Sequence, residues 1–167
     1  MVVTSGYPLL PALGICAAGA ALEGICAGPG VRDRMDELRL PRFAPPFAAW
    51  LVIGGLYYVI CFAVLYRLLE GDFGESPRQV ALGLAVLLLV CNAGWNYFFF
   101  RRRELRASFV YSLGYAAVAL CLAAALFRAD STAGWIFLPY LVYLLYGTWW
   151  GYALWRLNGR SIHPHSP

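Results

Sequence analysis

The stretch LVCNAGWNYFFFRRR, residues 89–103, decides the fold of this chain. It begins in an apolar run, carries Asn92 and Trp95 in its middle, and ends in three phenylalanines followed by three arginines. Aromatic rings next to arginines are typical of the place where a helix leaves the hydrocarbon of a bilayer. We therefore expect residues 98–100 to form an interfacial aromatic belt and residues 101–103 to anchor the helix end at the lipid headgroups.

The composition of the whole chain also indicates a lipid environment. Of its 167 residues, 61% are hydrophobic and 13% are charged, and the mean hydropathy is +0.63. Soluble domains carry about 25% charged residues. All 13 basic residues are arginines that lie between apolar runs and form no basic face, so the net charge of +4 does not indicate a nucleic-acid partner.

Five apolar stretches are each long enough to cross a bilayer as a helix, which takes about 20 residues. Because lipid offers no hydrogen bonds to bare backbone, each stretch should be helical. We expect an all-α integral membrane protein: a single five-transmembrane-helix bundle over residues 1–158, followed by a flexible polar tail at residues 159–167. The spans are expected at about residues 9–28, 47–69, 80–100, 107–127 and 135–157, joined by loops.

The arginines predict the orientation of this bundle. With five spans, the amino terminus, the second loop and the fourth loop share one side of the membrane and hold Arg67, Arg78 and Arg128. The other arginines lie in the first loop, the third loop and the tail. Since positively charged loops stay in the cytoplasm, we expect a multi-pass protein of the bacterial cytoplasmic membrane with a cytoplasmic carboxyl terminus.

Residue types that carry catalysis or bind metals are sparse in the spans. His163 and His165 lie in the tail, no CxxC, GxSxG, Walker A or HExxH motif occurs, and the five cysteines read as small apolar packing residues. We expect no catalytic residue, no metal and no cofactor. Among the carboxylates, only Glu23 lies in a span. It is near the end of its span, where we expect it to snorkel to the headgroups, although a functional role stays open.

Two groups of polar and aromatic residues remain. Asn92 and Trp95 are three positions apart and share a helix face, where the amide can bond a neighbouring helix or point at a ligand. In the last span, Tyr143, Gly147 and Trp150 fall on one stripe, and Pro139 opens that helix or kinks it. The stripe fits packing or an interface belt, and it also suits a flat apolar ligand with a few polar groups.

These segments resemble the TspO/MBR family of tryptophan-rich sensory and translocator proteins. Residues 133–158 look like the family's last helix in their AG, PYL and closing WRLN. The stretch PRFAPP at residues 41–46, followed by Tyr58, is similar to the family's P-x-x-x-P-P and later L-Y. Asn92, Trp95 and the phenylalanine run look like N-x-x-W-x-x-x-F-F. The resemblance covers residues from about 36 to 158.

The resemblance implies a membrane sensor, receptor or carrier that binds porphyrins, other flat hydrophobic molecules, lipids or sterols in a pocket among the helices. The chain departs from the family pattern, because Ala48, Gly54 and Tyr143 stand where the family has tryptophans, so we expect Trp50 and Trp150 to refill part of that volume. The ligand-binding residues expected on this basis are Trp50, Tyr58, Asn92, Trp95, Pro139, Tyr143 and Gly147.

Other functions and an oligomeric state stay open at this point. The chain could be an assembly subunit of a membrane or pigment–protein complex, or a porphyrin-degrading enzyme, an activity attributed to some family members. We expect binding without efficient breakdown, because Gly54 and Tyr143 stand at two of the family's tryptophan positions and the first loop has no Trp. The pairs Gly24–Gly28 and Gly147–Gly151 would suit either a homodimer or packing within one chain.

The orientation can be tested by labelling cysteines introduced into the tail and into the second loop of the protein in intact cells. A membrane-impermeant reagent is expected to label the second loop and to spare the tail. Labelling of the tail from outside would contradict the cytoplasmic carboxyl terminus.

Overall fold

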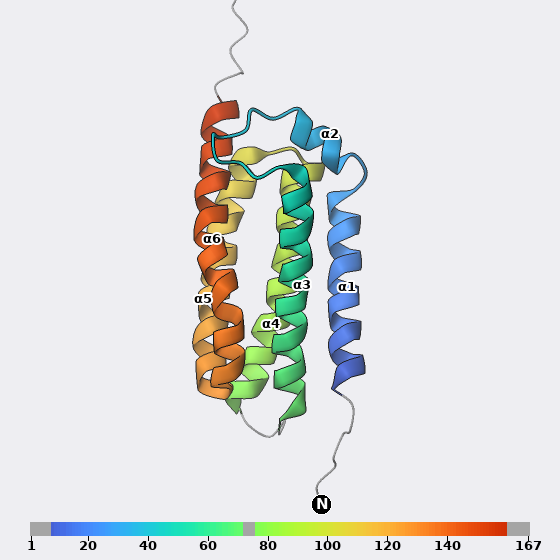
Figure 1. Ribbon diagram of the computed structural model, residues 1–167, viewed down its shortest axis with the longest axis vertical. Helices are drawn as coiled ribbons and strands as arrows, with labels where there is room; N and C mark the ends of the chain where they lie inside the picture. The colour runs from blue at the N-terminus through green and yellow to red at the C-terminus, as the bar shows by residue number, and fades with distance from the viewer. Residues whose placement is uncertain (1–7, 72–75, 160–167) are drawn as a thin grey trace, which may run out of the picture.

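The computed structural model describes residues 8–71 and 76–159 and places them in a bundle of long helices (Figure 1). Within these residues every regular element is helical. The elements are α1 (Leu9–Ala27), α2 (Val31–Asp36), α3 (Phe47–Glu70), α4 (Ser76–Asn96), the π-helical turn η1 (Tyr97–Arg101), α5 (Leu105–Ala129) and α6 (Ser131–Asn158).

Each of the five predicted stretches is helical, with ends that differ from the prediction by a few residues. The start of α6 moves to Ser131 because Asp130 caps it. The Asp130 carboxylate accepts hydrogen bonds from the backbone N–H groups of Thr132 and Ala133, at 2.9 and 3.2 Å. Pro139 therefore lies inside α6 and does not open it.

Four helices in the described part of the chain are long and apolar enough to cross a membrane. They are α1, α3, α4 with its continuation η1, and α5. The 28-residue α6 is not among them. Arg156 is its only charged residue, so its lower hydropathy comes from its many tyrosines and tryptophans, whose rings are amphipathic. The membrane character of the fold thus rests on four helices, and the predicted count of five spans is not confirmed.

The connection between α1 and α3 is more than the loop that the sequence analysis expected, because it contains the helix α2. Gly30, which precedes α2, has a φ of 82°, a left-handed conformation that suits glycine. Met35 and the following Leu38 are buried in a small apolar cluster with Phe99, Trp150 and Leu154. This segment therefore packs onto one end of the bundle.

The chain between α2 and α3 is also held to the end of α6, where Figure 1 shows it crossing the bundle. The Asn158 side chain accepts a hydrogen bond from the Arg39 N–H at 3.0 Å and donates one to the Arg39 carbonyl at 3.1 Å. The Tyr146 hydroxyl donates to the Phe43 carbonyl at 2.9 Å. These bonds fix the first connection over the helix ends.

The expected aromatic belt at residues 98–100 is wrong for at least one ring. Phe99 is only 1% exposed and stacks on Trp95, with ring centroids 4.8 Å apart and planes 13° apart. The π-helical turn adds one residue to the hydrogen-bonded loop, as in the bond from the Arg102 N–H to the Tyr97 carbonyl. Phe99 lies four residues after Trp95 and seven after Asn92, so it shares their helix face and packs into the protein.

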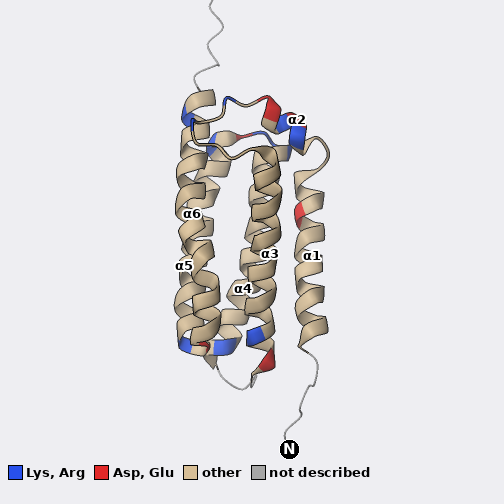
Figure 2. Cartoon of the chain, viewed as in Figure 1, with Lys and Arg blue, Asp and Glu red and all other residues tan. Residues whose placement is uncertain are grey.

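The arginines at the end of this turn and after it form hydrogen bonds and ion pairs with other parts of the protein. Arg101 donates to the Ile25 carbonyl at the end of α1, at 3.1 Å, and Arg103 forms an ion pair with Glu37 at 3.1 Å. Figure 2 shows that most charged residues lie at the two ends of the bundle. The exception along α1 is Glu23, the one acidic residue of that helix.

The glycine pairs contribute less to helix packing than the sequence suggested. Gly28 lies beyond the last residue of α1, with a φ of 69°, and its N–H caps the helix on the Gly24 carbonyl. A Cβ atom added at Gly147 would meet no atom within 4 Å, and one at Gly151 would approach only Phe109, at 3.9 Å. Self-association stays a prediction. The predicted tail lies outside the described residues from position 160 onward.

The carboxylate of Asp130 joins two helices, and its removal should destabilise the bundle. It accepts from Arg67 of α3 at 3.0 Å, is 8% exposed, and caps α6. We expect Asp130→Ala to lower the thermal midpoint in detergent, since a lost cap alone costs about 1 kcal/mol. Glu70→Gln is the matched control, because Glu70 also pairs with Arg67, at 3.5 Å, but is half exposed and should contribute little. Equal midpoints for the two variants would contradict this role.

Candidate functional site

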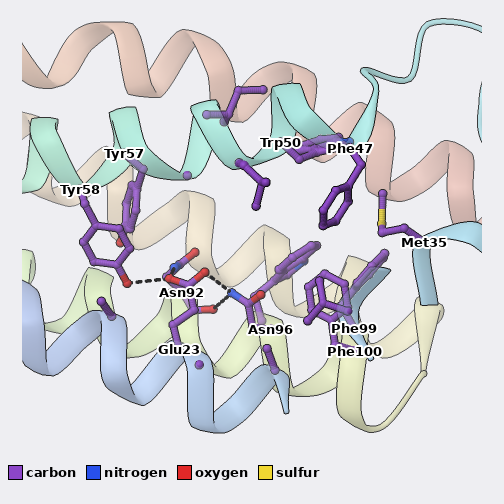
Figure 3. Close-up of a pocket in the computed structure, with 18 of the residues that line it drawn as sticks. Glu23, Met35, Phe47, Trp50, Tyr57, Tyr58, Asn92, Asn96, Phe99 and Phe100 are labelled. Atoms are coloured by element: carbon purple, nitrogen blue, oxygen red, sulfur yellow. Dashed lines mark hydrogen bonds between the residues drawn. The ribbon is translucent and has the colours of Figure 1, made fainter. Parts of the chain in front are cut away.

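A cavity of about 440 Å³ lies at the end of the bundle that carries α2. Its walls come from α1, α3, α4 and α6, while α2 and η1 contribute residues at that end. Most of the lining side chains are aromatic or aliphatic, and a small polar group lies on the side of α1 and α4 (Figure 3). The cavity thus combines an apolar body with a few polar atoms.

Glu23 is the centre of the polar group. Its Oε2 accepts hydrogen bonds from the Tyr58 hydroxyl at 2.6 Å and from the Asn92 side-chain amide at 2.7 Å. Its Oε1 accepts one from the Asn96 amide at 3.2 Å, as Figure 3 shows. One carboxylate on α1 therefore receives donors from both α3 and α4.

The expectation that Glu23 snorkels to the headgroups is wrong. The side chain is half-buried, lines the cavity and is bonded there by three side chains. Glu23 has hydrogen-bond donors inside the bundle, at its own level along α1. Its carboxylate therefore does not have to extend to the lipid headgroups to be hydrogen-bonded. Tyr58 and Asn92 supply two of these donors from helices that are distant in sequence.

The tryptophans form the second polar feature of the cavity. Trp50 of α3 and Trp150 of α6 both line it, with ring centroids 4.7 Å apart. The indole Nε1–H groups of both are buried and have no hydrogen-bond partner among the described residues. An indole nitrogen only donates, so a bound molecule with an acceptor atom could satisfy either group. Both rings therefore form part of the cavity wall.

Tyrosines of α3 and α6 line the part of the cavity that is farther from α2. Tyr57 and Tyr140 both contribute to the lining, with ring centroids 5.0 Å apart. The Tyr140 hydroxyl is hydrogen-bonded to that of Tyr115 on α5, and both rings are buried. These tyrosines belong to the buried core of the bundle, so the cavity borders that core directly.

The structure brings most of the predicted ligand-binding residues to this cavity. Among its lining residues are Trp50, Tyr58, Asn92, Trp95 and Tyr143. Pro139 and Gly147 of α6 are not among them. The amide of Asn92 makes the bond to a neighbouring helix that the sequence analysis left as one of two alternatives.

Two residues of the polar group were not predicted as site residues. Asn96 is four positions after Asn92 and is therefore on the same helix face. It is only 6% exposed and also donates to the Asn92 carbonyl at 3.0 Å. The spacing of the two amides was a signal that sequence reasoning could have used. Glu23 had no such signal, because its partners lie on other helices.

No group of three or more metal-ligating side chains occurs within residues 8–71 and 76–159. The chemistry that these residues offer is instead stacking by aromatic rings, hydrogen bonding by indoles and amides, and acceptance by one carboxylate. This combination suits the binding of an organic molecule.

Comparison with known proteins gives a family. The model of the TspO/MBR family matches residues 12–156, which include every helix from α1 to α6 in whole or in most of its length. A search of curated proteins gave no match.

The bond between Asn92 and Glu23 should stabilise the attachment of α1 to α4. We expect Asn92→Leu to lower the thermal midpoint in detergent, since a hydrogen bond between helices in a membrane contributes about 0.6 to 2 kcal/mol. Val90→Leu is the control, because Val90 is on the same helix and 48% exposed, and it should leave the midpoint unchanged. An Asn92→Leu protein as stable as the wild type would show that this bond contributes nothing to the fold.

Proposed function

The chain belongs to the TspO/MBR family, and from this premise we propose that it is a membrane sensor or carrier that binds a tetrapyrrole or a similarly flat hydrophobic molecule. The four apolar helices and the family together make it an integral membrane protein. The observation that carries the proposal is the cavity of about 440 Å³ between α1, α3, α4 and α6. Pockets for small molecules measure about 300–1,000 Å³ and are mostly apolar, with a few polar groups that orient the ligand.

Aromatic rings would supply most of the binding free energy. Trp95 stacks on Phe99, and Trp50 packs against Trp150, so the rings are held in place before a ligand arrives. Rings that are already ordered lose little conformational entropy on binding. Their faces would stack on a flat molecule, whose apolar area leaves water or lipid at the same time.

Polar groups would set the orientation of the ligand. On the α1 and α4 side, the Glu23 carboxylate offers acceptor oxygens, and the side-chain amides bonded to it offer further polar atoms. On the α3 and α6 side, the two unpartnered indole N–H groups offer donors. Carriage of the ligand and signalling to another protein are both compatible with such binding.

Breakdown of the bound tetrapyrrole is a second candidate function. The observation that favours it is the presence of three indoles in the lining, those of Trp50, Trp95 and Trp150. An oxidisable ring beside the macrocycle could take part in its degradation. The loss of two family tryptophan positions, at Gly54 and Tyr143, supports binding without breakdown, which we prefer.

The proposal is tested by titrating the purified protein with protoporphyrin in mild detergent. We expect a saturable shift of the Soret absorption band. Gly24→Leu should weaken this binding at least fivefold, because Gly24 lines the cavity and a Cβ there meets no atom within 4 Å, so the side chain can enter the open space. Gly14→Leu is the control, since Gly14 is on the same helix, has equal room and does not line the cavity.

Three outcomes separate the candidate functions. Equal weakening by the two glycine variants would contradict binding in this cavity. Absence of any saturable binding would favour a role in assembling other membrane proteins. Protein-dependent, saturable bleaching of the Soret band under illumination, with a defined product, would identify the degrading enzyme.

A further inference from the structure

Glu23 places a carboxylate in the wall of an otherwise apolar cavity, and we propose that this group selects ligands that carry a hydrogen-bond donor there, above all a protonated amine. The inference rests on the proposed function, because it concerns the same cavity. It adds the charge and polarity of the ligand, which the aromatic walls alone do not determine.

The first argument is the number of acceptor positions on the carboxylate. Each carboxylate oxygen has about two lone-pair positions. Oε2 accepts from both Tyr58 and Asn92, whereas Oε1 accepts only from Asn96, at the longer distance of 3.2 Å. One lone-pair position on Oε1 is therefore open to a hydrogen-bond donor of a ligand. An acceptor atom placed there would be repelled by the carboxylate oxygens.

The second argument is the charge of the group. The donors to Glu23 are a hydroxyl and two amides, all neutral. No arginine within the described residues forms an ion pair with it, and the nearby Arg101 donates instead to the Ile25 carbonyl. A carboxylate away from water is costly unless a positive charge accompanies it. A cationic ligand would bring that charge.

The third argument is the arrangement of polar atoms along the cavity. Glu23 lies beside Tyr58, whereas Trp50 lies toward the α2 end, near Phe47 (Figure 3). The Trp150 ring packs against Trp50, with centroids 4.7 Å apart, and the indole N–H groups of both are unpartnered among the described residues. The cavity thus has a carboxylate acceptor beside Tyr58 and donor-only indoles at the α2 end. The Tyr57 hydroxyl, which can donate or accept, also lines the cavity and has no partner in the part of the chain that the structure describes. A tetrapyrrole with peripheral carboxylates would place them near the indoles and away from Glu23.

The test uses three fluorescent probes that share one flat ring system. These are 1-pyrenemethylamine, a cation at neutral pH, 1-methylpyrene, which is neutral and has no donor, and 1-pyrenecarboxylate, an anion. Binding to the full-length protein in mild detergent is followed by energy transfer from tryptophan. We expect the wild type to bind the amine at least tenfold more tightly than methylpyrene, which corresponds to about 1.4 kcal/mol, and the anion most weakly.

Glu23→Gln keeps the size of the side chain and removes its charge. We expect this variant to lose the preference for the amine over methylpyrene. Both affinities are measured on the same variant, so a general loss of binding cancels in their ratio. Glu70→Gln is the control, because it makes the same change of net charge. Glu70 is the last residue of α3 and lies outside the cavity, so this variant should keep the preference for the amine. All affinities are compared at one detergent concentration, so that partition of the probes into micelles cancels.

The outcomes distinguish this inference from the proposed function. If methylpyrene binds and the wild type does not prefer the amine, the inference is overturned and the proposed function stands. If no pyrene probe binds, the inference is overturned, and the protoporphyrin titration alone decides the proposed function. An amine preference that persists in Glu23→Gln also overturns the inference. Should that variant fail to fold, the order of the three probes on the wild type decides alone.

Discussion

The hydrogen bonds to Glu23 are the interaction on which the arrangement of this bundle depends. In a bilayer, an apolar side chain gains little free energy when it exchanges lipid contacts for contacts with a neighbouring helix. Close packing and hydrogen bonds therefore hold the helices together. The buried residues of α1 are Ala12, Cys16 and Gly19, all of them small. Glu23 therefore supplies the strong polar link that joins this helix to α3 and α4 through Tyr58 and Asn92.

The same bonds help to produce the cavity. On the α1 side the wall consists of Glu23 and small residues such as Ala20, Gly24 and Ala27, which leave space that larger side chains would fill. The Glu23 carboxylate that attaches α1 is thus also accessible to a molecule in the cavity. Replacing this residue with one of another size would alter stability and binding together, so the informative change removes the charge and preserves the shape.

Sequence reasoning located the helices because their apolar length alone predicts them. It failed where the direction of a side chain decides its role. Glu23 near the end of a span can reach the headgroups or turn inward, and the choice depends on donors such as Tyr58 that are distant in sequence. Phe99 lies on the helix face of Trp95 and packs into the protein, and the α2 segment packs on Phe99 and Trp150. Neither feature has a signal in hydropathy.

The positions of tryptophan and glycine on α3 leave open space in front of Glu23. On the pattern that the chain resembles, the ring on α3 would stand at position 54, where this chain has Gly54. Trp50 lies four residues earlier on the same helix face, about 6 Å nearer the α2 end. Both positions line the cavity, and a Cβ at Gly54 would meet no atom within 4 Å. Trp50 and Trp150 therefore close the α2 end, while Gly54 leaves room farther along α3, toward the level at which Tyr58 bonds Glu23. A ligand in that room would have the carboxylate beside it.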